Sequence, residues 1–396
     1  MSLLYFDHAA SAPRRPDVAE AMEPWLRGVV GNPAGGHRAA REARRAVEES
    51  REVIAEFVGA APSEVVFTAG GTESCHAAIV GAAARHRRDH DGTAIVVSSV
   101  EHHAVLDAAR WAERHWSDVV VRMVGVDRDG VVDLDALREV VGDDTAVVSV
   151  MTANNETGVR QPLDAVGAIA RAAALDALWV HTDAVAAAPW LSLPVVTASS
   201  DLVSLCAHKL GGPVGAGALV LRRGAAVDPI VPGGGQEAGR RGGTVDVAAV
   251  VGFAAAARAS ARDLAERVER ATDLRDRLAR GIVDLPGCRV TAEEAARVAG
   301  TLHVTVEGVD SDELLYLLDA AGLCASAGAS CSSGATEPSH VLAAMGVTTR
   351  RARGALRLSL GAETTSDEVD AAIRIVRESV ARLAGTSDAA TGRLSP

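Results

Sequence analysis

Short apolar segments alternate with helical patterns between about residue 60 and residue 225, and this alternation constrains the fold more than any other feature. Parallel strands need a long crossover connection, usually a helix, so the pattern predicts a mainly parallel sheet wrapped by helices. In such open sheets, ligands bind at the carboxyl ends of the strands. Polar residues just past those ends are therefore the first candidates for a site. Strands are expected at residues 65–68, 94–98, 145–151, 178–181 and 201–206.

Two strand ends carry opposite charges. Asp183 follows the strand at 178–181, and Lys209 follows the strand at 201–206. The pair suits pyridoxal phosphate, because an amine forms a Schiff base with its aldehyde and a carboxylate keeps its ring nitrogen protonated. The alternative is that two surface charges close two strands, and the pair alone does not decide between these interpretations.

The segment after the strand at 65–68 has the composition of an anion site. Gly71 and Thr72 begin a helical pattern that runs to about residue 85. Free N–H groups, the helix dipole and the threonine hydroxyl converge on a phosphate in such turns. The same residues also open many helices as a simple turn and cap.

Two further strand ends carry side chains that suit a cofactor site. His102 follows the strand at 94–98 and could stack on a ring or move protons, or simply begin a helix. Asn155 follows the strand at 145–151 and could donate from its amide, or simply form a turn. Polar groups at five successive strand ends favour one shared site.

Cys331 lies in a run of Gly, Ala and Ser that lacks the bulk to form a core. A single thiol in a small, polar segment is a better candidate nucleophile than a buried structural cysteine. The alternative is a surface cysteine without a role.

At this point the chain resembles the cysteine desulfurases, fold-type I pyridoxal-phosphate enzymes related to class V aminotransferases, and within them group I, which has the longer cysteine loop. The resemblance runs from Tyr5 to about Leu383. It implies a mainly parallel α/β large domain and a smaller α+β domain. The matching stretches are residues 5–10, 31–34, 100–106, 154–158, 208–209, 233–237, 241–244, 326–333, 337–342 and 357–361.

The resemblance also implies roles for individual residues. Lys209 would carry the cofactor and remove the substrate Cα proton, His102 would stack on the ring and assist proton transfer, and Cys331 would take the substrate sulfur. Thr244 would reach the phosphate from a second subunit. The other expected cofactor-binding residues are Asp183, Gly71, Thr72, His208, Cys206 and Asn155, and the expected substrate-binding residues are Arg357, Asn155 and Asn32.

Some positions depart from the family pattern. Ala186 stands where a glutamine usually supports the cofactor oxygen, and Cys206 stands where a phosphate-binding serine is usual. Cys75 and His76 replace a common Asp-Asn pair, and the loop at 35–37 is shorter than usual. These departures indicate weaker or altered cofactor binding, or a specialised substrate or acceptor.

The length of 396 residues accommodates two domains. We expect a large cofactor-binding domain at 15–255, a small domain formed by 1–14 and 256–385 that carries the cysteine loop, and a flexible tail at 386–396. A long helical pattern from 245 towards 280 links the two. In the small domain, a strand is expected at 301–306 and helices at 310–321 and 366–383.

Charge and composition limit the classes of partner and the cellular location that we expect for this chain. The net charge is −12 and basic residues do not cluster with aromatics, so a nucleic-acid partner is not expected. The basic stretch at 38–51 also carries glutamates and predicts a solvated amphipathic helix that ends at Gly59. No apolar segment approaches the roughly 20 residues of a membrane span, and the N-terminus lacks a signal pattern, so the expected location is cytoplasmic. The five cysteines form no metal-binding pattern.

Three hypotheses follow. The first is a desulfurase that converts L-cysteine to L-alanine, works as a homodimer, and passes persulfide sulfur from Cys331 to an acceptor protein. The second is a carbon–sulfur lyase or selenocysteine lyase on the same fold, in which Cys331 is dispensable or selective. The third is a weakened homologue that acts as a binding or sulfur-relay partner, for which Ala186 and Cys206 are the support.

Overall fold

The structure is a computed structural model. It describes residues 3–28, 31–173, 178–328 and 339–391, and side chains as far as residue 384. Cys331 lies outside the described residues.

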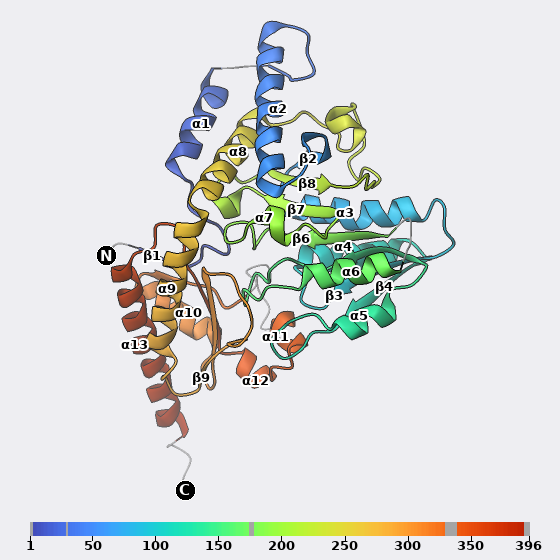
Figure 1. The fold of residues 1–396 in the computed structure, drawn as a ribbon. Coiled ribbons are helices and arrows are strands. Elements are labelled where there is room, and N and C mark those ends of the chain that lie inside the picture. The colour runs from blue at the N-terminus through green and yellow to red at the C-terminus, as the bar shows by residue number, and fades with distance from the viewer. Residues whose placement is uncertain (1–2, 29–30, 174–177, 329–338, 392–396) are drawn as a thin grey trace.

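A seven-stranded sheet forms the centre of the molecule (Figure 1), in the order β2-β8-β7-β6-β5-β3-β4. All strands run parallel except β8, which is antiparallel to both of its neighbours. The prediction of a mainly parallel sheet is therefore confirmed. The strands are β2 (Val65–Thr68), β3 (Thr93–Ser98), β4 (Val119–Val124), β5 (Thr145–Ser149), β6 (Trp179–Asp183), β7 (Leu202–Cys206) and β8 (Gly217–Leu221).

Helices cover both faces of this sheet, because alternate residues of each strand point to opposite sides. Val65 and Phe67 of β2 pack with one set of helices, whereas Val66 between them packs with another. The first set is α1 (Pro16–Arg27), α2 (Arg38–Val58), α7 (Leu193–Val196) and α8 (Val247–Arg262). The second set is α3 (Gly71–His86) and α4 (His103–His115). Two more helices, α5 (Leu134–Val140) and α6 (Leu163–Ala172), pack on Val96 of β3 and Val148 of β5.

A second, smaller set of elements packs around its own apolar cluster, which includes Phe6 and Leu278. Its antiparallel sheet has the order β12-β10-β9, and β1 pairs in parallel with β11. Figure 1 shows these elements at the lower left, beside the N-terminus. They comprise β1 (Leu4–Tyr5), α9 (Leu264–Ile282), β9 (Cys288–Val290), β10 (Thr301–Val306), α10 (Ser311–Ala320), β11 (Leu323–Cys324), β12 (Ala355–Ser359) and α13 (Ser366–Thr391). The short helices α11 (His340–Ala344) and α12 (Thr349–Ala352) pack in a separate apolar cluster that includes Val100 and Val159.

The helical pattern expected from 245 to 280 is divided in two at Asp263, whose φ of −103° and ψ of 12° are not helical. The Asp263 carboxylate accepts a hydrogen bond from Arg15 over 2.6 Å, and also pairs with Arg267. Helix α8 before the break packs on α1 and α2, whereas α9 after it packs on α13. The packing partners of this helical segment thus change at Asp263. The bounds of the two domains, with the large domain at 15–255, stay a prediction.

The final helix begins with a capping box. The Thr365 hydroxyl accepts from the Glu368 N–H over 3.3 Å, and the Glu368 carboxylate accepts from the Thr365 N–H over 2.8 Å. The helix α13 continues to Thr391, beyond the expected end at 383 and into the segment expected to be a flexible tail.

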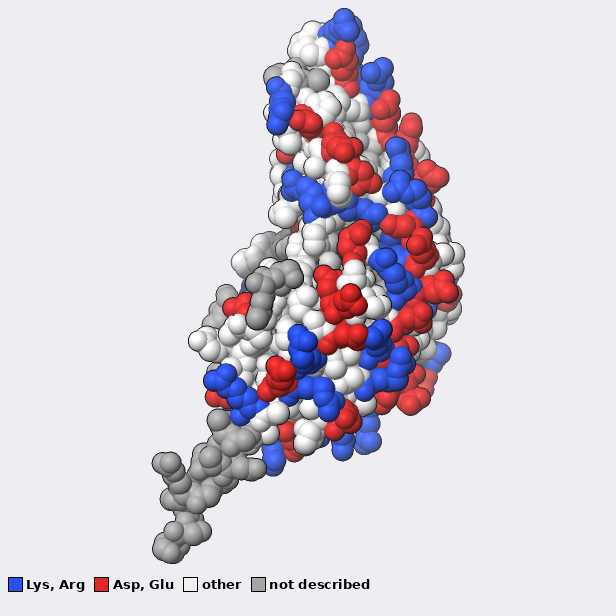
Figure 2. Space-filling view, turned by 90° about the vertical axis from the view of Figure 1, so that its left-hand side faces the viewer, with Lys and Arg blue, Asp and Glu red and all other residues white. Residues whose placement is uncertain are grey.

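Basic and acidic side chains are interspersed over the face that Figure 2 shows. Along α2, Arg38 pairs with Glu42 over 2.9 Å, and Gly59 ends the helix at a φ of 70°. The solvated amphipathic helix predicted here is therefore confirmed. Within the described part of the chain, no helix is both long enough and apolar enough to span a membrane.

Candidate active site

A cavity of about 250 Å³ lies at the carboxyl edge of the central sheet. It brings together side chains that the sequence analysis had placed at separate strand ends and in the small domain. The predicted site residues that line it are Gly71, Thr72, His102, Asn155, Asp183, Cys206, His208, Lys209 and Arg357, and the other lining residues are Ala9, Ala10, Ala104, Met151, Val185 and Ala186.

Lys209 lies in a 3₁₀ turn (His208–Leu210) directly after β7. Its Nζ donates to the carbonyl oxygen of Ala10 over 2.8 Å, and also to that of Ala9. Burial lowers the pKa of this amine, because removal from water disfavours the charged form. A more readily deprotonated amine is a better nucleophile towards an aldehyde.

The first turn of α3 forms the end of the cavity expected to hold a phosphate. Strand β8 approaches this turn so closely that a Cβ on Gly217 would lie 2.6 Å from the Gly70 carbonyl carbon. His208 lies beside Cys206, with its Nε2 3.9 Å from the thiol sulfur. Burial lowers the pKa of His208 to about 4 and raises that of Cys206 to about 11, so both are neutral at pH 7.

Asp183 is the last residue of β6, and its Oδ1 accepts from the Val185 N–H over 2.9 Å. His102 caps α4, where its Nδ1 accepts from the Ala104 N–H over 3.0 Å. Burial lowers the pKa of His102 and favours the neutral ring, which then carries its proton on Nε2.

Arg357 of β12 reaches the cavity from the small sheet and is almost fully buried. It donates to Asp7 Oδ1 over 2.8 Å and to the main-chain oxygen of Asn155 over 2.9 Å. Its Nε is buried and has no hydrogen-bond partner among the described residues. A buried, unsatisfied guanidinium N–H at a cavity wall suits an anionic group such as a carboxylate.

Among the predicted site residues that the structure describes, two do not line this cavity. Asn32 and Thr244 are exposed, and Asn32 uses its side-chain oxygen to accept from the Ala34 N–H over 3.0 Å. Their neighbours in the chain, Pro33, Ala34 and Val245, line a separate surface hollow. Their assignment to the site remains a prediction, which for Thr244 involves a second subunit.

Glu156 contacts the described residues on both sides of the cysteine-containing segment. Its Oε2 accepts from the Ser339 hydroxyl over 2.5 Å, and a Cβ on Gly328 would lie 3.0 Å from the same oxygen. Burial raises the pKa of Glu156. Neither Glu156 nor Asp7 was among the predicted site residues, although both lie within stretches that carry the family resemblance.

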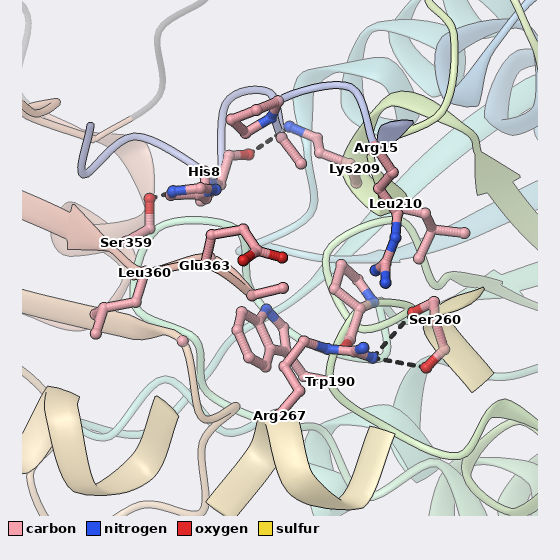
Figure 3. Close-up of a pocket in the computed structure, with 18 of the residues that line it drawn as sticks. His8, Arg15, Trp190, Lys209, Leu210, Ser260, Arg267, Ser359, Leu360 and Glu363 are labelled. Carbon is pink, nitrogen blue, oxygen red and sulfur yellow. Dashed lines mark hydrogen bonds between the residues drawn. The ribbon is translucent and has the colours of Figure 1, made fainter. Parts of the chain in front are cut away.

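A second cavity of about 640 Å³ adjoins the first, and the two share Ala9, Asn155, Ala186 and Lys209 as lining residues. Figure 3 shows it between the Lys209 turn and the Leu360 segment, with the Glu363 side chain pointing into it above Trp190. Ala186, the position where the family usually has a glutamine, therefore leaves space between the two cavities.

The fold and the strand-end site define a class of enzyme, and comparison with known proteins agrees. The family model for class V aminotransferases (Aminotransferase class-V) matches residues 4–372. The chain belongs to this family, and the predicted fold-type I architecture is confirmed.

The similar proteins include cysteine desulfurases. The IscS-like cysteine desulfurase of Mycobacterium tuberculosis is 43% identical over 98% of this chain and 99% of that protein. The cysteine desulfurase IscS of Methanosarcina thermophila is 39% identical over 97% of this chain and 93% of that protein. A solved structure of a NifS-like protein superimposes with a TM-score of 0.88 at 33% identity, covering 96% of this chain and 100% of that one. The predicted resemblance to the cysteine desulfurases is confirmed.

Proposed function

We propose that this protein is a pyridoxal-phosphate-dependent cysteine desulfurase. The observation that carries the proposal is the convergence of Lys209, Asp183, His102 and Arg357 on one cavity. The similarity to named desulfurases over nearly the whole chain supports it.

The residues present fit pyridoxal phosphate. A buried amine of lowered pKa, a strand-end carboxylate and a helix N-terminus lie around one small cavity. Lys209 would hold the cofactor, Asp183 its ring nitrogen, and Gly71, Thr72, Cys206 and His208 the phosphate, with Thr244 contributed by a second subunit. When bound, pyridoxal phosphate supplies an acceptor for the electron pair left by removal of a Cα proton.

The substrate carboxylate would bind Arg357, with the Asn155 amide beside it and Asn32 contributing at the edge of the site. The Arg357 Nε, which has no hydrogen-bond partner among the described residues, would supply a donor for this purpose. Lys209 would remove the Cα proton, and neutral His102 would assist the proton transfers. The Asp7 carboxylate and the Asn155 main-chain oxygen would hold the guanidinium in position.

Cys331 would attack the substrate sulfur as a thiolate. The bond between Cβ and sulfur breaks, the sulfur stays on Cys331 as a persulfide, and protonation releases the carbon skeleton as L-alanine. The persulfide sulfur would then pass to an acceptor protein. We further propose a cytoplasmic homodimer with a large domain at 15–255.

The test is to incubate the purified protein with pyridoxal phosphate and L-cysteine, quantify alanine and locate any sulfur adduct by mass spectrometry. Alanine with an adduct on Cys331 supports the proposal. Pyruvate and free sulfide without that adduct would place the protein among the lyases. Absence of turnover with bound cofactor would favour a binding or relay role.

A further inference from the structure

The short helix α11 lies between the small sheet and the central sheet (Figure 1). Its apolar residues Val341 and Leu342 are buried in one cluster with Val100 and Val159. Val100 lies in the connection that follows β3, and Val159 lies in the connection that follows β5. The helix therefore packs on two of the connections that carry predicted site residues.

The first of these connections carries His102 and is held to α11 by a hydrogen bond. His340, the first residue of the helix, lies with its Nε2 2.9 Å from the main-chain oxygen of Glu101. A carbonyl oxygen only accepts, so the His340 ring carries a proton on Nε2. The same ring packs edge-on against that of His103, with 4.7 Å between the ring centroids. Both residues that flank His102 in the chain are therefore in contact with His340.

The second connection carries Asn155 and is held to α11 in a similar way. Ser339 caps the helix, because its hydroxyl accepts from the Leu342 N–H over 3.2 Å, and it also donates to Glu156 Oε2 over 2.5 Å. Glu156 is fully buried and follows Asn155 directly in the chain. The main-chain oxygen of Asn155 in turn accepts from Arg357 over 2.9 Å. Ser339 therefore contacts the connection that supplies Asn155 and that holds Arg357.

The two connections are also bonded to each other. The side-chain amide of Asn154 donates to the main-chain oxygen of Val100 over 3.0 Å. Its Oδ1 accepts from the N–H groups of Glu156 and Thr157, each over 2.9 Å. The start of α11 thus contacts two connections that form one hydrogen-bonded unit, and a shift of its first turn would reach both of them.

We propose that Ser339 and His340 are positioning residues for the reaction at the cofactor. Their hydrogen bonds hold the ring-stacking His102 and the carboxylate-binding Arg357 in the geometry that removal of the Cα proton requires. Both side chains lie outside the wall of the cofactor cavity, so they act through the residues that they hold. A displacement of about 1 Å from the reacting geometry can lower a rate about 100-fold. The proposal rests on the proposed function for the roles of the residues that are held.

The alternative is that the two hydrogen bonds only stabilise the small domain, with Ser339 acting as a helix cap. The two explanations require different side chains at this position. An ionised aspartate caps a helix as well as a serine does, but it has no proton to donate to Glu156. Ser339→Asp therefore separates the capping of α11 from the hydrogen bond to Glu156.

Exchange of the Cα hydrogen of L-alanine for deuterium gives the first test. L-alanine carries no sulfur, so the exchange requires removal and return of one proton at Cα and no thiol. The full-length protein, loaded with pyridoxal phosphate, is incubated in deuterium oxide below the unfolding temperature of every variant, and the exchange is followed by proton NMR. We expect the rate at saturating L-alanine to fall between about tenfold and about 100-fold in His340→Leu and in Ser339→Ala.

Conservative variants separate the hydrogen bonds from the bulk of the side chains. His340→Gln keeps an N–H donor near the position of Nε2, and Ser339→Thr keeps the hydroxyl, so both should restore most of the rate. Ser339→Asp should remain as slow as Ser339→Ala. Native rates in His340→Leu and Ser339→Ala, or in Ser339→Asp, would overturn the proposal. Failure of both conservative variants would also contradict it, because the bonds would then not decide the rate.

The ring of His102 gives a second readout, which needs no cofactor. Its Nδ1 accepts from the Ala104 N–H over 3.0 Å, which fixes the proton of the neutral ring on Nε2. The full-length protein is labelled with ¹⁵N-histidine, and the ring signals are assigned with His102→Gln. In His340→Leu we expect the Nδ1 signal to move towards that of a protonated nitrogen, as the ring loses its fixed tautomer. An unchanged signal would refute the positioning of His102.

His115→Leu and Thr348→Ala are the matched controls. His115 is exposed at the other end of α4, where its Nδ1 lies 2.8 Å from the main-chain oxygen of Trp111 in the same helix. Thr348 caps α12, and its hydroxyl accepts from the Arg351 N–H over 3.4 Å. Both variants should keep the native exchange rate and the native His102 signals. A native protein without any exchange would contradict the proposed function, and the His102 signals would still decide the positioning.

Discussion

Arg357 and Asp7 form an ion pair over 2.8 Å, although 350 residues separate them in the chain. This contact fixes a buried guanidinium at the wall of the cavity, and it joins the first strand segment to the last strand of the small sheet. The orientation of the expected carboxylate-binding group thus depends on the N-terminal segment.

Asp7→Asn should weaken substrate binding. Loss of the charged partner leaves Arg357 less well oriented, and hydrogen bonds between charged groups contribute about 1.5–3 kcal/mol. We expect KM for L-cysteine to rise about tenfold with a smaller change in kcat. Steady-state kinetics test this against Asp284→Asn, which removes an exposed ion pair with Arg377. Equal KM values for the two variants would refute it.

Lys209→Ala should abolish turnover and the visible absorption of the bound cofactor. Removal of a general base alone lowers rates about 10²–10⁴-fold, and this residue would also anchor the cofactor. Activity and absorbance of the reconstituted variant provide the measurement. Lys209→Arg keeps the charge but cannot replace the amine, so recovery of activity in that variant would contradict the assigned role.

Glu101→Gln should change how stability depends on pH. The folded-state pKa of about 8 lies above the ordinary value of 4.5, so the folded protein holds this proton more tightly than the unfolded chain. The resulting stability is fully present below pH 4.5 and is lost as pH rises through about 8. Urea unfolding at about pH 5 and about pH 9 should show a smaller fall for the variant than for the native protein. Glu378→Gln, on the exposed side of α13, should match the native protein.

Gly217→Ala should disturb the phosphate end of the cavity. Its Cβ would lie 2.6 Å from the Gly70 carbonyl carbon, so β8 or the turn before α3 must move. Overpacking of this kind costs about 1–3 kcal/mol, and we expect weaker cofactor binding as well. Equilibrium dialysis and thermal unfolding give both quantities. Gly36→Ala is the control, since a Cβ there would meet nothing within 4 Å.

Ala186→Gln should strengthen cofactor binding. The added amide would occupy the space between the two cavities and offer one more hydrogen bond, which contributes about 0.5–1.5 kcal/mol. We expect pyridoxal phosphate to dissociate about two- to tenfold more slowly. If the rate is unchanged or faster, the space at Ala186 serves a different purpose from the one the family pattern implies.

The central sheet was predictable because its signals are local. The apolar runs at 65–68 and 201–206 correspond to β2 and to β7. The polar residues after them occupy the shared edge of the sheet, as the parallel order requires. Gly59 likewise ends α2, as expected, and its φ of 70° lies in the left-handed region.

The remaining features depend on contacts between distant parts of the chain. The break at Asp263 could not be predicted from the helical pattern, because its partner Arg15 lies 248 residues away. The role of Asp7 could not be predicted either, because nothing in the local sequence distinguishes it from an exposed aspartate and its partner Arg357 lies 350 residues away. His181 reads as an ordinary strand residue, and only the pairing of β5, β6 and β7 places it between two serines.

The junction between the two chain ends also sets an order of events during synthesis. The main-chain oxygens of Ala9 and Ala10, which accept from Lys209, leave the ribosome before Lys209 does. The strand β1 that precedes them pairs with β11, and Asp7 bridges to Ser359, so these partners emerge only after the whole central sheet has been made. A nascent chain therefore holds the segment around β1 unpaired until β11 and β12 have been made, and the cavity closes only when the small sheet is finished.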